Sequence, residues 1–275
     1  MLKKLSTSAR LLPSPSKSDL PLFTTRALGA QWLHAVRGAR PRCVSLPTQF
    51  AGKPNALAEF CIAIVDATAQ YACAFKPQIA YFAAEGAEAQ LERVCEHIRD
   101  AHPTVPIILD AKRGDIGDTA KLYAREAFER YNAHAVTVNP YLGTDSLEPF
   151  FAHAGRGVIV LCRTSNAGSG TFQTQLIDGA PLYEHVARRA ASEWAQLGEV
   201  GLVVGATYPE ELAKVRSLVG DMPLLVPGVG AQGGDAATVI RVGRAANGYG
   251  LIINSSRAIL YASSGEDFAE AAAGV

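Results

Sequence analysis

A dense run of opposed charges follows one of the apolar stretches of the sequence. Residues 108–120 read ILDAKRGDIGDTA, with Asp110, Lys112 and Asp115 inside a span of six positions. Asp110 and Lys112 are two residues apart on a predicted strand, so their side chains point to the same face. The pair could be a plain ion pair, and Asp115 could cap the helix that follows. Buried ion pairs add little net stability, however, so the clustering favours a chemical role.

A further lysine, Lys76, stands inside a second apolar stretch, between the residues ACAF and a proline. Lysine is rarely buried in a strand without a partner. The aspartates at the end of a neighbouring strand could supply that partner, which would make an array of lysines and aspartates. Such a lysine could also form a Schiff base, as in the barrel aldolases, and spacing alone leaves Lys76 and Lys112 open to that role.

Two segments near the end of the chain carry features of a phosphate site. Residues 226–234 read VPGVGAQGG, a glycine-rich turn before a helix, and residues 254–259 read NSSRAI. Backbone N–H groups of such a turn, together with a helix N-terminus, bind phosphate. Arg257 would add a bidentate charge. The two segments therefore predict that a phosphorylated small molecule binds here.

The elements that must position these residues are alternating strands and helices. From about residue 54, continuous apolar runs of the kind found in buried parallel strands alternate with amphipathic segments. The runs span residues 71–82, 106–112, 135–142, 157–165, 201–207, 223–230 and 250–256. Each predicted strand has polar or glycine residues at its expected carboxyl end, such as Lys76 and Asn139, and no GxGxxG fingerprint follows an early strand. We therefore expect an α/β fold, a closed (β/α)8 TIM barrel, rather than an open doubly wound sheet.

Composition limits the classes of partner. The chain has 275 residues, 48% of them hydrophobic, with 26 basic and 26 acidic side chains, so no net charge draws it to nucleic acid or an anionic membrane. No apolar run approaches the roughly 18 residues of a membrane span. The five cysteines lack CxxC spacing, which predicts a reducing, cytoplasmic setting. The sequence shows no metal-ligand cluster, histidine-bearing triad or cofactor motif.

In combination, these motifs resemble those of the orotidine 5'-phosphate decarboxylase family, in particular its bacterial branch with the Asp-Ala-Lys-Arg-Gly-Asp signature. The segments that carry the resemblance lie between about residues 54 and 260 and read LDAKRGDIGDTA, FKPQIAYF, VTVNPYLG, LCRTSN, PGVGAQGGD and NSSRAI. The resemblance implies a (β/α)8 barrel, a homodimer, and conversion of orotidine monophosphate to uridine monophosphate without a cofactor.

The resemblance also implies roles for individual residues. The alternating lysine and aspartate array of the family falls on Lys76, Asp110, Lys112 and Asp115, with Lys112 as the proton donor to C6 of the pyrimidine. Asp115 and Thr119 match the pair that reaches into the partner's site across the dimer interface.

The binding residues are carried over in the same way. Ser165 matches the residue that contacts the pyrimidine, and Gln232 and Arg257 match the residues that hold the phosphate. The expected ligand is thus a small-molecule nucleotide.

The first strand departs from the family pattern. Its Val-Gly-Leu-Asp-Pro segment should fall on residues 37–41, which read RGARP, so Arg40 replaces an aspartate that contacts the ribose. We therefore divide the chain into a leader of doubtful structure, residues 1–36, and a barrel domain, residues 37–275. The basic, Ser- and Pro-rich leader resembles an organelle transit peptide.

A shift of reading frame offers another explanation of this departure. Codons CGT GGG GCT CGA CCC encode Arg-Gly-Ala-Arg-Pro, and the same bases read one position later encode Val-Gly-Leu-Asp-Pro. The leader up to about Ser45 would then be out of frame. If the leader is genuine, an alternative function is that of a catalytically impaired nucleotide-binding homologue.

Overall fold

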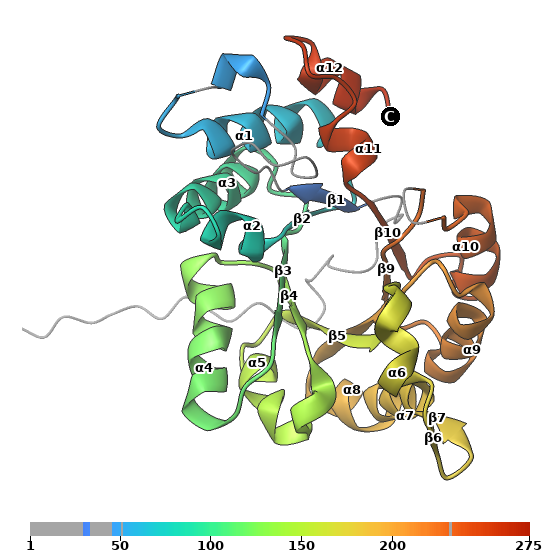
Figure 1. Ribbon diagram of the computed structural model, residues 1–275. Coiled ribbons are helices and arrows are strands. Elements are labelled where there is room, and N and C mark those ends of the chain that lie inside the picture. Colours follow the sequence, from blue (N-terminus) through green and yellow to red (C-terminus); the bar gives the residue numbers. More distant parts are fainter. Residues whose placement is uncertain (1–29, 34–45, 51, 231–232) are drawn as a thin grey trace, which may run out of the picture.

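The computed structural model describes residues 30–33, 46–50, 52–230 and 233–275. Eight parallel strands form one sheet in the order β2-β1-β10-β9-β8-β5-β4-β3. Bridges between Phe75 and Ile107 and between Gln78 and Asp110 join β2 to β3, so the sheet closes on itself. Figure 1 shows the strands as an inner ring with the helices around it. The predicted (β/α)8 barrel is confirmed.

All seven strands predicted from the apolar runs are present, in shorter form. The barrel strands are β1 (Ala30–Leu33), β2 (Ala74–Pro77), β3 (Ile108–Arg113), β4 (Ala135–Val138), β5 (Gly157–Arg163), β8 (Glu199–Val204), β9 (Leu224–Val226) and β10 (Leu251–Ser255). A small antiparallel hairpin, β6 (Leu176–Ile177) with β7 (Ala180–Pro181), projects from the loop after β5. The end of the predicted 71–82 strand is instead part of a helix, because the chain turns out of the sheet after Pro77.

Helices cover the outside of the sheet. They are α1 (Ala56–Thr68), α2 (Ile79–Ala83), α3 (Glu88–Ala101), α4 (Gly117–Arg125), α5 (Glu148–Phe151), α6 (Gly170–Gln173), α7 (Leu182–Arg189), α8 (Ala195–Leu197), α9 (Pro209–Val219), α10 (Ala236–Gly243), α11 (Arg257–Leu260) and α12 (Phe268–Ala273). A π-helical turn extends α4 over Glu126–Arg130, and another, Ala190–Trp194, joins α7 to α8. Their apolar faces form the main core against the outer face of the strands.

The inside of the barrel is filled by its own apolar layer. Seven buried side chains, one from each strand other than β1, pack together there: Ala74, Ile108, Ala135, Ile159, Val203, Leu225 and Ile252. Such layers of side chains from successive strands make a barrel interior a packed core and not a pore. This layer forms the floor beneath the residues that follow two positions later on each strand.

The first strand lies earlier in the chain than the family pattern suggests. β1, Ala30–Leu33, pairs with β2 on one side and with β10 on the other. It therefore falls within the segment that the sequence analysis assigns to the leader. Arg40 lies outside the described residues, and the division of the chain at residue 37, like the reading-frame hypothesis, stays a prediction.

Aromatic side chains join the two ends of the barrel domain. The ring of Phe60 on α1 stacks on that of Phe268 on α12, with centroids 5.2 Å apart. Phe50 packs edge-on against both rings, at 5.8 and 5.4 Å. All three rings are buried, so they contribute both apolar burial and favourable ring geometry. The last helix, α12, is thereby anchored to α1.

A buried arginine fixes the strands that lead to the predicted phosphate site. Arg216 on α9 donates to four backbone carbonyls, those of Gly220, Met222, Gly243 and Gly250, at 2.6 to 2.7 Å. Burial lowers the pKa of Arg216 to about 10, and Asp221 opposes that shift. The guanidinium remains charged at neutral pH, so its four bonds tie α9 to the starts of β9 and β10.

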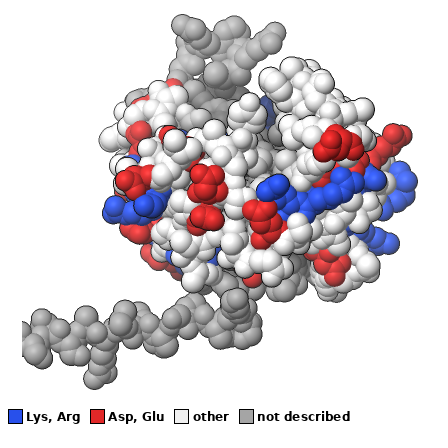
Figure 2. All heavy atoms as spheres, turned by 90° about the horizontal axis from the view of Figure 1, so that it is seen from below, with Lys and Arg blue, Asp and Glu red and all other residues white. Residues whose placement is uncertain are grey.

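The described surface carries mixed charges. Figure 2 shows acidic and basic side chains interspersed over one face, which agrees with the equal numbers of each in the sequence. Among the described helices, none combines the length and the apolar character that crossing a membrane would require.

A partly buried histidine links the starts of β3 and β4. The backbone N–H of Ile107 donates to Nδ1 of His134 at 2.9 Å, which requires that this nitrogen be unprotonated. Burial lowers the pKa of His134 to about 4, and the charges of Arg156 and Arg99 add to the shift. The unfolded chain, with a histidine pKa near 6.5, therefore takes up the proton first as the pH falls.

We predict that His134 makes the free energy of unfolding fall as the pH is lowered from about 6.5 to about 4. Partial exposure of the ring reduces the expected loss to about 1–2 kcal/mol. In His134→Asn the side-chain oxygen can still accept the Ile107 N–H, but the titrating group is gone. Urea unfolding at several pH values should therefore show a flatter pH profile for His134→Asn than for the wild type. The control His185→Asn, on α7, should keep the wild-type profile; parallel profiles for all three proteins would contradict the prediction.

Candidate active site

A polar layer lies directly above the apolar floor of the barrel. Lys76, Asp110, Thr137 and Asn254 each follow a floor residue by two positions, so strand periodicity points them into the same interior. All four are buried, with exposed fractions of 1, 1, 1 and 5%. They lie on β2, β3, β4 and β10, near the carboxyl ends of those strands. In a parallel barrel this end carries the active site.

The Asp110 carboxylate is the centre of this layer. Lys76 donates to its Oδ2, and Lys112 donates to its Oδ1 at 2.6 Å. The hydroxyl of Thr137 also donates to Oδ1, at 3.0 Å. The structure therefore brings together three residues of the predicted lysine and aspartate array, Lys76, Asp110 and Lys112. One carboxylate holds two ammonium groups side by side.

The pKa values of this group respond to burial and to charge in opposite directions. Burial alone would raise the pKa of Asp110, but the positive charges of Lys76 and Lys112 hold it below its usual range. Burial lowers the pKa of Lys76, the Asp110 carboxylate opposes that shift, and the Lys112 charge adds to it. Asp110 is consequently an anion throughout the neutral range, and the lysines are held by a fixed negative charge.

The backbone of Lys112 has an unusual conformation. Its φ angle is +48°, in the left-handed region that costs a residue other than glycine roughly 1–3 kcal/mol. The pairing of β3 with β4 shifts register between Leu109 and Arg113, around this residue. The Thr137 hydroxyl accepts the N–H groups of Ala111 and Lys112, both at 3.0 Å, and so supports the irregular turn. These bonds fix where the Lys112 side chain begins.

Asp115 and Thr119 lie beyond this turn, in the loop after β3 and in the first turns of α4. Oδ1 of Asp115 accepts the N–H of the next residue, Ile116, at 2.8 Å. α4 begins at Gly117, and its N-cap position is Ile116. The interpretation of Asp115 as the helix cap is therefore wrong, because the chain continues in extended form for one more residue. Thr119 is exposed on the surface of the molecule.

The strand end beside this loop is anchored to the helix that follows. Arg113 forms a bidentate pair with Glu126, with bonds of 2.8 to 3.0 Å, and its guanidinium lies 4.4 Å from the centre of the Tyr123 ring. Gly114 passes close to Asn139, since a Cβ at position 114 would lie only 3.2 Å from that of Asn139. The turn between Lys112 and Asp115 is thus held on both sides.

Ser165 lies at the end of β5, close against the end of β8. A Cβ added to Gly205 would meet the Cα and N of Ser165 at 2.8 and 2.9 Å, so only glycine fits. Gly205 also donates its N–H to the carbonyl of Arg163 at 2.7 Å. This close approach places Ser165, half-buried, at the carboxyl end of the barrel, and its contact with the substrate stays a prediction.

The glycine-rich segment forms a tight turn after β9. Gly228, Gly230 and Gly233 have φ angles of 96, 74 and 92°, which favour glycine. Asp235 then caps α10 by accepting the Thr238 N–H at 2.7 Å. Gln232 lies outside the described residues. The predicted partner Arg257 is exposed at the start of α11, directly after β10.

Two residues of the site were not singled out from the sequence, although one of them, Asn254, opens the NSSRAI segment. Thr137 holds both Asp110 and the Lys112 backbone, and Asn254 has a buried side-chain Oδ1 without a hydrogen-bond partner among the described residues. The available signal was strand periodicity, because each follows a floor residue by two positions. The neighbouring residues in the sequence, a serine pair after Asn254 and valines on both sides of Thr137, did not indicate a role in the site.

Known proteins resemble this chain over most of its length. Residues 49–272 match the orotidine 5'-phosphate decarboxylase / HUMPS family. The orotidine 5'-phosphate decarboxylase of Janthinobacterium sp. (strain Marseille) is 61% identical over 235 residues, which cover 86% of this chain and 87% of that protein. The protein of the same name from Ralstonia pickettii (strain 12J) is 62% identical over the same length and the same shares.

Solved structures give the same result. The Leishmania donovani OMP decarboxylase is 39% identical with a TM-score of 0.76, covering 89% of this chain and 90% of that one. The Leishmania donovani UMP synthase is 41% identical with a TM-score of 0.78, covering 90% of this chain and 53% of that one. The resemblance carried by the sequence motifs is thereby confirmed. This chain belongs to the orotidine 5'-phosphate decarboxylase / HUMPS family.

Proposed function

We propose that the protein is a lyase that decarboxylates orotidine 5'-phosphate to uridine 5'-phosphate, the last step in making this nucleotide. Its relatives at 61 and 62% identity bear the name of that activity. The observation that carries the proposal is the buried array in which the Asp110 carboxylate holds two lysines at the carboxyl end of the barrel. The reaction needs this arrangement because loss of CO2 leaves negative charge at C6 of the pyrimidine.

The two lysines differ in their access to water, and this difference assigns their roles. The side chain of Lys76 is 1% exposed, whereas that of Lys112 is 41% exposed. Lys112 can therefore give a proton to C6 and regain one from solvent, while Lys76 is buried against the Asp110 carboxylate and holds the array in place. Preorganised charge of this kind stabilises the developing carbanion without reorganisation during the reaction.

Asp115 supplies the repulsive part of the mechanism. A substrate carboxylate that faces a second carboxylate is destabilised by like charge until it leaves as CO2. Binding energy from the remote phosphate, held by Gln232, Arg257 and the glycine-rich turn, offsets that cost. Ser165 contacts the pyrimidine and orients it over Lys112.

We further propose that the enzyme is a homodimer in which Asp115 and Thr119 reach into the partner's site. Apolar side chains around them support this arrangement. Ile116, Leu122 and Tyr141 expose 60, 58 and 80% of their surface on the loop after β3, on α4 and on the loop after β4. Exposed apolar surface of this kind marks protein interfaces. The thiols of Cys61, Cys95 and Cys162, which are buried and form no disulfide, support a cytoplasmic location.

Replacement of Lys112 tests the proposed proton donor. We expect Lys112→Ala to lower kcat by about 1,000-fold or more, since both a proton donor and a positive charge are lost. The assay follows consumption of orotidine 5'-phosphate and formation of uridine 5'-phosphate by the purified chain. Lys214→Ala is the matched control, because Lys214 is a half-exposed lysine on α9 that pairs with Glu184 at 3.9 Å.

Three outcomes would contradict this assignment. Unchanged turnover in Lys112→Ala would exclude Lys112 as the donor. Binding of uridine 5'-phosphate without turnover by the wild type would identify an impaired homologue. An adduct trapped on Lys76 or Lys112 by borohydride would indicate Schiff-base chemistry instead.

Mixing two inactive variants tests the shared site. In a hybrid dimer of Lys112→Ala and Asp115→Ala, one site combines the intact Lys112 of one chain with the intact Asp115 of the other. We therefore expect the mixture, after exchange of subunits, to regain about a quarter of the wild-type activity, because half of the dimers are hybrids with one working site each.

The control mixture combines Lys112→Ala with Asp110→Ala. Both residues belong to the same chain's site, so every site of that hybrid lacks one of them and activity should stay absent. Native mass spectrometry verifies that hybrids have formed in both mixtures. If the first mixture also stays inactive although hybrids are present, Asp115 acts within its own chain.

A further inference from the structure

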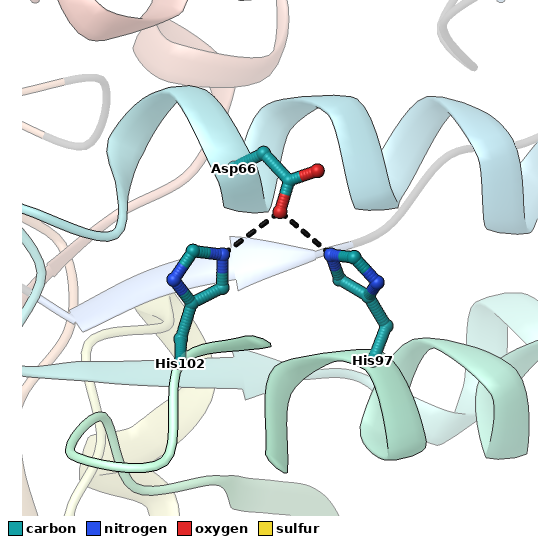
Figure 3. Close-up of side chains that lie close together, drawn as sticks. All are labelled: Asp66, His97 and His102. Atoms are coloured by element: carbon teal, nitrogen blue, oxygen red, sulfur yellow. Dashed lines mark hydrogen bonds and ion pairs between the residues drawn. The ribbon is translucent and has the colours of Figure 1, made fainter. Parts of the chain in front are cut away.

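A second cluster of reactive side chains lies outside the active site. Asp66 on α1, His97 on α3 and His102 at the C-cap of α3 converge, as Figure 3 shows. Nε2 of His97 lies 2.6 Å, and Nε2 of His102 2.8 Å, from the same oxygen of Asp66, Oδ1. We call these three residues the Asp66 cluster. Two imidazole nitrogens from one segment thus meet one carboxylate oxygen from another helix.

The donor set of the Asp66 cluster matches that of a transition-metal site. Imidazole nitrogen and carboxylate oxygen are the usual ligands of Zn²⁺ where three protein groups leave a position for water. The two rings are not stacked: their planes differ by 68° with centroids 5.9 Å apart, so both nitrogens can face one point. All three ligand atoms lie within 4.8 Å of one another.

We propose that the Asp66 cluster binds a divalent first-row transition ion, with Zn²⁺ as the representative. Ligand atoms at a tetrahedral Zn²⁺ are about 3.3 Å apart, so the nitrogens and the oxygen need to separate by less than about 1 Å. The side chains are 50, 29 and 22% exposed for Asp66, His97 and His102, which leaves room for this movement and for water as a further ligand. No metal-ligand cluster is visible in the sequence, because the three ligands come together only in the folded chain.

The position of the Asp66 cluster gives the ion a structural role. α1 and α3 run back from the carboxyl ends of the strands, and Asp66, His97 and His102 lie towards their last turns. The cluster therefore lies at the amino end of the barrel, away from Lys112. An ion there would link α1 to α3 and stabilise the fold while leaving the chemistry at the other end unchanged.

Zn²⁺ titration of the full chain, freed of tags and of bound metal, tests the proposal. We expect one ion per chain by calorimetry, and a rise in Tm of about 5–10 °C at a free Zn²⁺ concentration about 100 times the dissociation constant. Co²⁺ should give the visible bands of a nitrogen and oxygen site, without the charge-transfer bands of thiolate ligands. The conversion of orotidine 5'-phosphate should be the same with and without the ion.

Asp66→Asn is the critical variant, because its side-chain oxygen can still accept hydrogen bonds from both histidines. We expect it to fold with a metal-free Tm near that of the wild type, yet to bind Zn²⁺ at least about 100-fold more weakly. His97→Ala should lose the ion as well, while the matched control His185→Ala, on α7, should keep it.

Two results would overturn the proposal. One is the same Zn²⁺ affinity in Asp66→Asn and the wild type, which would place any bound ion elsewhere. The other is the absence of a Zn²⁺-dependent rise in Tm, which would leave the Asp66 cluster as a hydrogen-bonded link between α1 and α3. Neither result depends on the proposed decarboxylation, because both are read from metal binding and thermal unfolding.

Discussion

The contact between Asp110 and Lys76 is the constraint on which the site depends. Both side chains are 1% exposed, and an ion taken out of water costs several kcal/mol unless an opposite charge and hydrogen bonds replace its hydration. Burial of either residue without the other would therefore destabilise the fold. Lys112 and Thr137 complete the shell of Asp110, so four side chains from three adjacent strands must be correct together. Such a group contributes little net stability, because the free energy of desolvation offsets the ion pairs. Its presence therefore favours a role in catalysis.

The barrel makes this costly arrangement possible by its layered interior. The apolar floor excludes water from below, which strengthens every charge interaction in the layer above it. Lys112 stands one layer higher, where β3 departs from regular pairing and the backbone enters the left-handed region. If β3 were regular, the chain would continue straight beyond the Asp110 carboxylate. The irregularity instead turns the chain towards Asp115, so strain in the backbone and the position of Lys112, the proposed proton donor, have the same origin.

The sequence predicted the features that depend on local pattern. Seven strands follow from continuous apolar runs, and the pairing of Asp110 with Lys112 follows from their spacing of two. The pairing of Lys76 with Asp110 could also be predicted, because successive strands of a barrel lie next to each other. Thr137 was missed because threonine is ordinary in strands, and Asn254 because the NSSRAI segment was considered only for phosphate binding. Only the closed barrel places both side chains in the layer of Lys76 and Asp110.

The first strand and the Asp66 cluster show two further limits of sequence reasoning. β1 has four residues, AQWL, too few for its pattern to stand out, and its place is set by pairing with β2 and β10. Asp66 and His97 are 31 positions apart, and they meet only because α1 and α3 pack side by side around the barrel. Both features arise from contacts between distant segments. The two ends of the barrel thus have different roles. Residues at the carboxyl ends of the strands can be selected for catalysis, because packing and contacts between helices elsewhere provide the stability that buried charges do not provide.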